Sequence, residues 1–225
     1  MPPPESDDGL RARLIRTACE LTGTGLTRNT SGNLSHRLAD GFLITPSGMR
    51  YDRLHNDDLV EVGWDGVPRG RRLPSSEWRF HRDILQARPE ASVVLHAHPP
   101  FATAIACLRE DIPPFHYMVA RLGGRDVRCA PYATFGTAEL SAHALAALDG
   151  RRACLLANHG VIVLGADFES TLALAVELET LAEMYCRARQ IGRPVLLSDA
   201  EMAVNVGKFA TYGVQPGEPG NTARR

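Results

Sequence analysis

The sequence predicts an α/β protein, because segments with apolar residues at helical spacing alternate along the chain with short, β-rich apolar segments. The 225 residues fit one domain with one hydrophobic core. Hydrophobic residues form 44% of the chain and charged residues 23%, a balance that is ordinary for a globular protein and too polar for a membrane protein. We therefore expect a single domain over residues 8–213, a disordered N-terminus at 1–7 and a flexible C-terminal tail at 214–225.

The first third of the chain predicts one helix and three short strands. The helix covers residues 8–22, because its apolar residues recur at helical spacing, Asp7 or Asp8 can cap its start and Gly23 can end it. The predicted strands are short apolar segments at residues 34–38, 42–45 and 59–62. The first two strands are joined by Ala39-Asp-Gly41, a link that is typical of a β-hairpin.

The rest of the chain predicts three helices separated by strands. One helix begins near Pro74-Ser75-Ser76-Glu77, where a proline, a serine cap and an acidic first turn agree, and it ends near Arg88-Pro89. A second helix covers residues 101–108, and the longest covers 168–190 with Asp167 as its cap. The remaining strands are apolar, β-rich segments at residues 93–98, 153–157 and 161–164.

Charge and cysteine content exclude several classes of function. The formal net charge is −1 and the chain has no long basic run, so we expect no binding to nucleic acid or to an anionic membrane surface. The five cysteines are scattered and include no C-x-x-C pair, which argues against a disulfide framework or a thiolate zinc site. The N-terminus lacks the basic and apolar regions of a signal peptide, which predicts a cytoplasmic protein.

The histidines His96 and His98 are the first candidates for a metal site. They lie two residues apart on a predicted strand, where side chains alternate between faces, so both imidazoles point the same way. Two unrelated histidines are the alternative, because a zinc site needs three or four ligands. His159 leads the candidates for a third ligand, because it lies in a turn before Gly160, where the backbone can approach closely. The other histidines lie on polar or helical stretches, at His36, His55, His81, His116 and His143.

Glu77 is the candidate that would complete this metal site. It is predicted to share a helix face with Phe80, His81 and Ile84, so its carboxylate should point inward. The alternative is a solvated residue at the helix start. Three histidines with an open position would suit a catalytic zinc ion.

Three turns rich in small residues are candidates for binding an anion. Ser75 and Ser76 precede a predicted helix N-terminus, where unpaired N–H groups and the helix dipole favour negative charge. Each of the turns Gly32-Asn33 and Ser47-Gly48 is by itself commonplace loop sequence. Together, the three turns predict a phosphate pocket built from backbone amides and hydroxyls without a basic patch.

Seven strings of sequence show a more specific resemblance, namely Thr30-Ser-Gly-Asn-Leu-Ser35, Ile44-Thr-Pro-Ser-Gly48, Leu73-Pro-Ser-Ser-Glu-Trp-Arg-Phe-His81, His96-Ala-His98, His116-Tyr-Met118, Cys129-Ala-Pro-Tyr-Ala-Thr-Phe-Gly-Thr137 and Asn158-His-Gly160. In these strings the chain resembles the class II aldolase and sugar-phosphate epimerase family, which includes the adducin head. The similarity runs from about Leu14 to Gly213 in one order. It implies a largely antiparallel central sheet flanked by helices, in a homotetramer with active sites at subunit contacts.

The resemblance also implies an activity and roles for individual residues. The activity is that of a zinc-dependent aldehyde-lyase of carbohydrate metabolism, which reversibly cleaves a ketose 1-phosphate to dihydroxyacetone phosphate and a short aldehyde. Tyr117 matches a tyrosine that reaches the aldehyde end of the substrate, and Tyr212 matches one that covers the site, although the residues alone would indicate half-buried packing for both. Glu77 matches the proton carrier. The zinc ligands are matched by Glu77, His96, His98 and His159, and the phosphate loops by Gly32, Asn33, Ser47, Gly48, Ser75 and Ser76.

Three positions depart from the aldolase pattern and bear on the alternatives. Ser47 replaces a threonine, Ala97 an asparagine and Asn158 a histidine. Ser47 keeps a hydroxyl, and Ala97 should face away from the metal by strand alternation. A sugar-phosphate 4-epimerase is the nearest alternative, but its members carry aspartate where this chain has Glu77. A methylthioribulose-phosphate dehydratase agrees less well with the motifs, and an adducin-like binding module would have lost its metal ligands.

Overall fold

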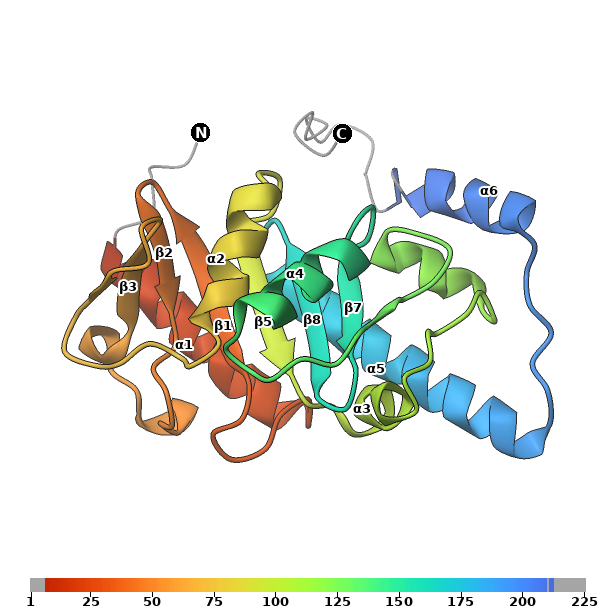
Figure 1. Ribbon diagram of the computed structural model, residues 1–225, viewed down its shortest axis with the longest axis horizontal. Coiled ribbons are helices and arrows are strands. Elements are labelled where there is room, and N and C mark those ends of the chain that lie inside the picture. Colours follow the sequence, from red (N-terminus) through yellow and green to blue (C-terminus); the bar gives the residue numbers. More distant parts are fainter. Residues whose placement is uncertain (1–6, 210, 213–225) are drawn as a thin grey trace.

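The sheet of this protein has eight strands in the order β4-β3-β2-β1-β5-β8-β7-β6 (Figure 1). The computed structural model describes residues 7–209 and 211–212. All neighbouring strands are antiparallel except β6 and β7, which are parallel. The strands are β1 (Asn33–Leu38), β2 (Gly41–Ile44), β3 (Val60–Gly63), β4 (Pro68–Arg69), β5 (Val93–Ala97), β6 (Cys129–Ala130), β7 (Ala153–Leu156) and β8 (Gly160–Gly165). The predicted α/β class and the largely antiparallel sheet are confirmed.

Helices cover both faces of the sheet, which gives three layers (Figure 1). The described helices are α1 (Asp7–Gly23), α2 (Trp78–Ala87), α3 (Pro100–Cys107), α4 (Ala138–Ala147), α5 (Phe168–Ile191) and α6 (Asp199–Phe209). One face packs against α1, α3 and α5, and the other against α2 and α4. Each interface has its own apolar core: Leu14, Leu95 and Leu178 lie in one, and Phe80, Ile162 and Leu140 in the other.

Most predicted elements are present, but two helix starts differ from the predictions. Asp7 and Asp8 lie within the first turn of α1. The helix α2 begins at Trp78, and Glu77 is its N-cap residue without a capping hydrogen bond from its side chain. The prediction that a serine caps α2 and that Glu77 lies in the first turn was therefore wrong. The reason is a turn ahead of the helix, in which the Trp78 amide donates to the Ser75 carbonyl oxygen over 3.1 Å. At α5 the Asp167 side chain accepts from the Ser170 amide, as predicted.

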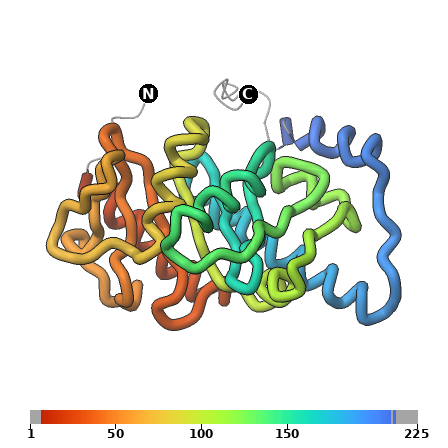
Figure 2. The backbone as a smooth tube through the Cα atoms, viewed as in Figure 1, coloured from red at the N-terminus to blue at the C-terminus, as the bar shows by residue number. Residues whose placement is uncertain are grey.

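The antiparallel order brings three distant parts of the chain to one end of the sheet. Strand β5 runs opposite to both β1 and β8, so its C-terminal end lies beside the N-terminal ends of its two neighbours. Asn33 pairs with His96, and Ala97 pairs with Val161. Figure 2 shows these strands side by side although they come from the first, middle and last thirds of the chain. Residues at this end can therefore form one site.

The two predicted terminal segments lie wholly or almost wholly outside the described residues. The N-terminus at 1–7, apart from Asp7, and the tail at 214–225 lie outside the described residues.

All five cysteines are free thiols. Among the described residues, no helix combines the length and apolarity that crossing a membrane would require.

Asp58 provides a testable link between the fold and pH. Its buried carboxylate accepts hydrogen bonds from the His55 amide, Arg72 and Arg71 over 2.9, 2.8 and 2.9 Å, and these contacts lower its pKa from 3.8 to about 2. The folded pKa is below the unfolded value, so the stabilisation is complete above about pH 4 and is lost as the pH falls through about 2. In metal-free protein, we expect Asp58→Asn to lower the melting temperature at pH 7 and to flatten its decline at acid pH. Calorimetry showing parallel declines in both proteins would contradict this.

Candidate metal centre and active site

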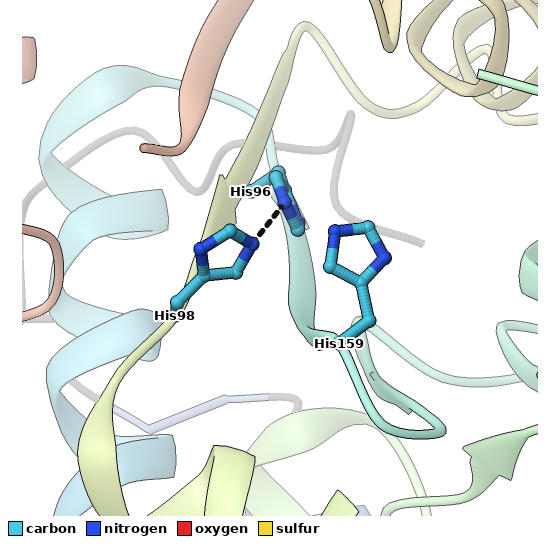
Figure 3. A group of neighbouring side chains, drawn as sticks. All are labelled: His96, His98 and His159. Atoms are coloured by element: carbon cyan, nitrogen blue, oxygen red, sulfur yellow. Dashed lines mark hydrogen bonds between the residues drawn. The ribbon is translucent and has the colours of Figure 1, made fainter. Parts of the chain in front are cut away.

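Three histidines meet where β5, β7 and β8 end or begin (Figure 3). His96 lies in β5, His98 follows that strand directly, and His159 lies in the turn between β7 and β8. One ring nitrogen of each lies within 4.8 Å of the others. The Nε2 atoms of His96 and His98 are 2.9 Å apart. The predicted shared direction of His96 and His98, and the choice of His159 as their neighbour, therefore agree with the geometry.

The local backbone explains why these side chains converge. Ala97 points into the apolar core on the opposite side of the sheet, so the residues on either side of it point toward the site. Gly160 is needed beside them, because a Cβ atom there would collide with the Ala97 carbonyl oxygen and the His98 ring. The segment after His98 is held by Glu179 of α5, whose carboxylate accepts the Phe101 and Ala102 amides over 2.8 and 2.9 Å.

Glu77 lies against the same three rings. Its side chain enters the site from the start of α2 and the residue is only 7% exposed. Oε2 is 3.2 Å from Nε2 of His96, and Oε1 is 3.2 Å from Nε2 of His159. The predicted inward carboxylate is correct, although the residue precedes the helix instead of occupying its first turn.

These four side chains fit a divalent metal ion. Donors about 2.0–2.1 Å from a tetrahedral zinc ion are about 3.3 Å from one another, close to the separations of 2.9, 3.2 and 3.2 Å in this site. Nδ1 of His96 donates to the Val161 carbonyl oxygen over 2.8 Å, which leaves Nε2 free of a proton in the neutral ring. Oε1 of Glu77 is buried and accepts no hydrogen bond from a described residue. An ion would satisfy all these lone pairs.

Electrostatics favour the metal-binding forms of Glu77 and His98, whereas the neighbouring Glu77 carboxylate outweighs burial and raises the pKa of His96 in the metal-free site. Burial by itself raises the pKa of Glu77, but the imidazoles of His96 and His159 outweigh burial and hold that pKa below its usual value. Burial also lowers the pKa of His98 to about 4, with help from the neighbouring histidines. Near neutral pH, Glu77 is therefore a carboxylate and His98 is a neutral imidazole, the form that coordinates zinc.

A pocket of about 340 Å³ opens beside this centre. Glu77, His98 and His159 line it, whereas His96 is fully buried behind them. All six residues predicted to bind phosphate also line the pocket: Gly32, Asn33, Ser47, Gly48, Ser75 and Ser76. The structure thus brings the three predicted turns to one cavity, and one of them immediately precedes the N-terminus of α2.

The sequence analysis assigned no role to several other residues that line the pocket. Tyr132 and Phe135 line the pocket, and their side chains are half exposed or more. They belong to one of the seven strings, but their spacing gives no sign that they face the metal. Asn158 was noticed only as a departure from the family pattern; it lines the pocket with a positive φ of 55° and accepts from Arg109 over 2.8 Å.

The two predicted tyrosines do not line this pocket. Tyr117 is 49% exposed and Tyr212 is 76% exposed in the single chain, so the interpretation of both as half-buried packing residues fails for Tyr212. Each ring contacts Phe209, with centroid distances of 6.3 and 5.5 Å. They therefore lie together on the surface near α6.

The fold and the site define an α/β protein that can hold a divalent metal ion next to a pocket lined by small, polar turns. The sequence model of the "Class II Aldolase and Adducin N-terminal domain" matches residues 12–186. The chain belongs to this class II aldolase family. Members of the family named as aldolases share most of its length, so the predicted aldehyde-lyase is confirmed and the non-catalytic binding module is disfavoured.

Two curated relatives illustrate the range of substrates among similar proteins. The chain is 53% identical over 210 residues to the 5-methylthioribulose-1-phosphate/5-deoxyribulose-1-phosphate aldolase of Rhodospirillum rubrum, covering 93% of this chain and 95% of the relative. It is 46% identical over 207 residues to the L-fuculose phosphate aldolase of Escherichia coli K12, covering 92% and 96%. The sequence motifs pointed to an L-fuculose-1-phosphate aldolase, and that similarity is confirmed. An aldolase acting on methylthioribulose phosphate was not among the predicted alternatives.

A solved structure supports the same family assignment. It is named L-fuculose 1-phosphate aldolase and matches with a TM-score of 0.86 at 42% identity, covering 88% of this chain and 95% of the other. The aldolase of that name from Thermus thermophilus matches with a TM-score of 0.71 at 31% identity, covering 83% and 98%. The predicted sheet flanked by helices is therefore that of known class II aldolases.

Proposed function

We propose that the protein is a zinc-dependent aldolase that reversibly cleaves a ketose 1-phosphate to dihydroxyacetone phosphate and a short aldehyde. The convergence of Glu77 with three histidines at the edge of the pocket is the observation that supports this most directly. The neutral His98 and ionised Glu77 suit a zinc ion. The names of the relatives indicate three candidate substrates, L-fuculose 1-phosphate, 5-methylthioribulose 1-phosphate and 5-deoxyribulose 1-phosphate.

The pocket residues would first fix the phosphate end of the substrate. Ser47, Ser75 and Ser76 line the cavity together with the small turns at Gly32 and Gly48, and the serine hydroxyl groups would donate to the phosphate. The N-terminus of α2 adds a favourable dipole for an anion. With the phosphate held there, the ketone and its neighbouring hydroxyl extend toward Glu77 and the histidines, which lie in the same cavity wall.

Glu77 would then move the proton. When bound, zinc supplies a Lewis acid that polarises the ketone oxygen and stabilises negative charge developing beside it. In the synthetic direction, the Glu77 carboxylate removes a proton from carbon 3 of dihydroxyacetone phosphate, and the electron pair left on that carbon forms the new bond to the aldehyde carbon. In cleavage, the hydroxyl on carbon 4 gives up its proton to solvent as the bond between carbons 3 and 4 breaks, and Glu77, protonated from solvent, returns a proton to carbon 3. In synthesis, the former aldehyde oxygen takes up a proton from solvent as the new bond forms. The balance requires no redox partner.

We also propose that the protein acts in the cytoplasm as a homotetramer. Tyr117 and Tyr212 are exposed and do not line the pocket of their own chain. Their proposed roles, reaching the aldehyde end of the substrate and covering the site, therefore require the pocket of a neighbouring subunit. The cluster with Phe209 provides a contiguous aromatic surface for that contact.

Incubation of the zinc-loaded protein with each candidate ketose 1-phosphate tests the activity. We expect release of dihydroxyacetone phosphate from at least one of them, detected by coupled reduction of that product, and no release after removal of the metal by a chelator. A product that keeps all the carbon atoms of the substrate would instead indicate epimerisation or dehydration. Stereochemical analysis of the condensation products from a panel of aldehydes would then identify the preferred aldehyde.

The phosphate assignment predicts a selective effect of two serines. We expect Ser75→Ala/Ser76→Ala to raise KM for phosphorylated substrates by about tenfold or more, because each lost hydrogen bond to a charged group is worth roughly 1.5–3 kcal/mol. Unphosphorylated analogues should be affected much less. Ser75 Oγ also accepts the Glu77 amide over 3.3 Å. The single variant Ser76→Ala leaves that contact intact and serves as the matched control, and equal KM changes for both substrate types would remove the assignment.

A further inference from the structure

A chain of buried polar side chains runs from Glu77 through Asn33, at the pocket wall, into the interface between β1 and α2. Ser35, His81 and Asn33 are all buried. Ser35 Oγ lies 2.7 Å from Nδ1 of His81, Nε2 of His81 contacts Oδ1 of Asn33, and Nδ2 of Asn33 donates to Oε2 of Glu77 over 3.0 Å. The catalytic candidate is thus the last member of a connected series.

The secondary structure explains why these residues meet. Asn33 and Ser35 are two apart on β1, so their side chains share a face of the sheet. His81 lies four residues after Glu77, one helical turn along α2. The helix packs against that sheet face, and the His81 ring stacks on Phe80 with a centroid distance of 4.7 Å. An apolar residue would suit the surroundings of His81, so its two polar contacts need an explanation.

When the His81 ring is neutral, the donors and acceptors of this chain can be ordered in one way only. The Glu77 carboxylate accepts hydrogen bonds only, so Asn33 must present its NH₂ group to Glu77 and its oxygen to His81. Nε2 of His81 must then carry a proton, and Nδ1 must accept from the Ser35 hydroxyl. Each member fixes the orientation of the next, and Ser35 is the start.

We propose that His81 is a positioning residue, which orients Glu77 for proton transfer through Asn33 without touching the substrate. The inference rests on the proposed function, in which Glu77 is the proton carrier. Without the His81 donor, Asn33 can rotate its amide and turn an oxygen toward the Glu77 carboxylate. Repulsion would displace that carboxylate, whose Oε1 has no hydrogen-bond donor among the described residues. A displacement of about 1 Å can reduce a rate on the order of 10²-fold.

Two substitutions at His81 separate orientation from packing. His81→Leu fills the space without a donor, whereas glutamine in His81→Gln can place an N–H group near the position of Nε2. We expect both variants to keep stoichiometric zinc, because His81 is not a ligand. His81→Leu should slow the exchange of the carbon 3 proton of dihydroxyacetone phosphate in deuterated water by about 10–100-fold in kcat, with little change in KM. His81→Gln should recover most of the rate. Exchange at the parent rate by His81→Leu, or equal losses in both folded variants, would overturn the proposal.

The tautomer of His81 gives a second test that does not depend on activity. NMR of ¹⁵N-histidine-labelled protein at pH 7, with and without zinc, should show His81 neutral with its proton on Nε2. In Ser35→Ala, which removes the donor to Nδ1, a fraction of the other tautomer should appear. A proton on Nδ1 in the parent, or an unchanged spectrum in Ser35→Ala, would overturn the ordered chain. Failure of the proposed function would look different. In that case the parent would not exchange the carbon 3 proton, or Glu77→Gln would exchange it as fast as the parent. His81 would still carry its proton on Nε2.

Discussion

We expect Glu77→Gln to retain most of its zinc. Its rate of proton exchange at carbon 3 of dihydroxyacetone phosphate should fall by about 10²- to 10⁴-fold. Glutamine preserves the shape of the side chain and leaves an oxygen toward the metal, while three imidazoles still supply most of the binding. The substitution removes the basicity and replaces one carboxylate oxygen by an NH₂ group, while the remaining oxygen can still face the metal or Asn33. A carboxylate whose pKa is held below its usual value by His96 and His159 needs a change in its surroundings before it accepts a proton. Displacement of Glu77 from the metal when substrate oxygens bind would provide that change.

Proton exchange followed by NMR in deuterated water isolates this step from the aldehyde, so the measurement does not require the physiological substrate. Glu177→Gln is a matched control, because Glu177 lies on α5, pairs with Arg121 over 3.2 Å and does not line the pocket. It should exchange at the parent rate. If Glu77 were only a residue at the helix start, its amide would cost at most about 1 kcal/mol of stability and leave exchange intact. Parent-rate exchange by zinc-loaded Glu77→Gln would therefore end the proposed role.

The sequence predicted the elements with long or well-bounded signals and missed those with weak or short ones. The strand of His96 was found because it is a continuous apolar, β-rich run, and the long helix α5 because Asp167 caps its start and Gly192-Arg-Pro194 ends it. Strands β4 and β6 have two residues each, too few for any period. The helix α6 was not predicted, although the sequence marks its start with a serine followed three residues later by a glutamate. Ser198 and Glu201 exchange hydrogen bonds as in a capping box.

Helix α4 was missed for a different reason. Its segment Ala138–Ala147 is rich in alanine, so the apolar face stands out little from the rest of the helix. Its cap is visible in retrospect, because Thr137 accepts the Leu140 amide over 3.2 Å. Local propensity identifies such a helix only when the cap is weighed together with composition.

The candidate site depends on contacts between residues that are far apart in the sequence, and local patterns do not predict such contacts. His96 and His98 could be paired from strand geometry alone, because the alternation of side chains in β5 extends to His98, the residue directly after the strand. The position of His159 beside them depends on β8 pairing with β5, a contact between residues more than sixty positions apart. The inward direction of Glu77 was predicted from a helix face that the residue does not occupy; its burial results from the turn at Ser75. Tyr132 and Phe135 enter the pocket on a loop, for which no period exists.

The identity of the aldehyde depends on the parts of the site that sequence predicts least. Tyr132, Ala133 and Phe135 give the pocket an apolar wall, whereas the predicted phosphate turns are polar. Relatives of similar length are named for different substrates, namely L-fuculose phosphate in one case and 5-methylthioribulose 1-phosphate or 5-deoxyribulose 1-phosphate in the other. Differences of one apolar group are worth only about 1–3 kcal/mol in such a pocket. Substrate preference can therefore change while the metal centre and phosphate turns stay the same.

His159→Ala is expected to lose both bound zinc and cleavage. A zinc site at neutral pH binds with roughly 10–16 kcal/mol, so removing one of four ligands should weaken binding on the order of 10²–10³-fold. His159 is the informative position, because spacing alone could not identify it as the proposed third ligand. Its Nε2 lies 3.2 Å from Glu77 Oε1, so its loss also frees the carboxylate that would move the proton.

Metal analysis after dialysis against a competing chelator, together with cleavage assays at saturating and limiting zinc, measures both consequences of His159→Ala. We expect the parallel variants His96→Ala and His98→Ala to behave in the same way, because all three rings converge on one point. His143→Ala is the control: its ring lies outside the pocket and contacts the Pro131 carbonyl oxygen over 3.2 Å, so it should keep both zinc and activity. Full zinc occupancy in His159→Ala would show that the third ligand lies elsewhere, and activity restored by excess zinc would show that the ring serves binding and takes no part in the chemical step.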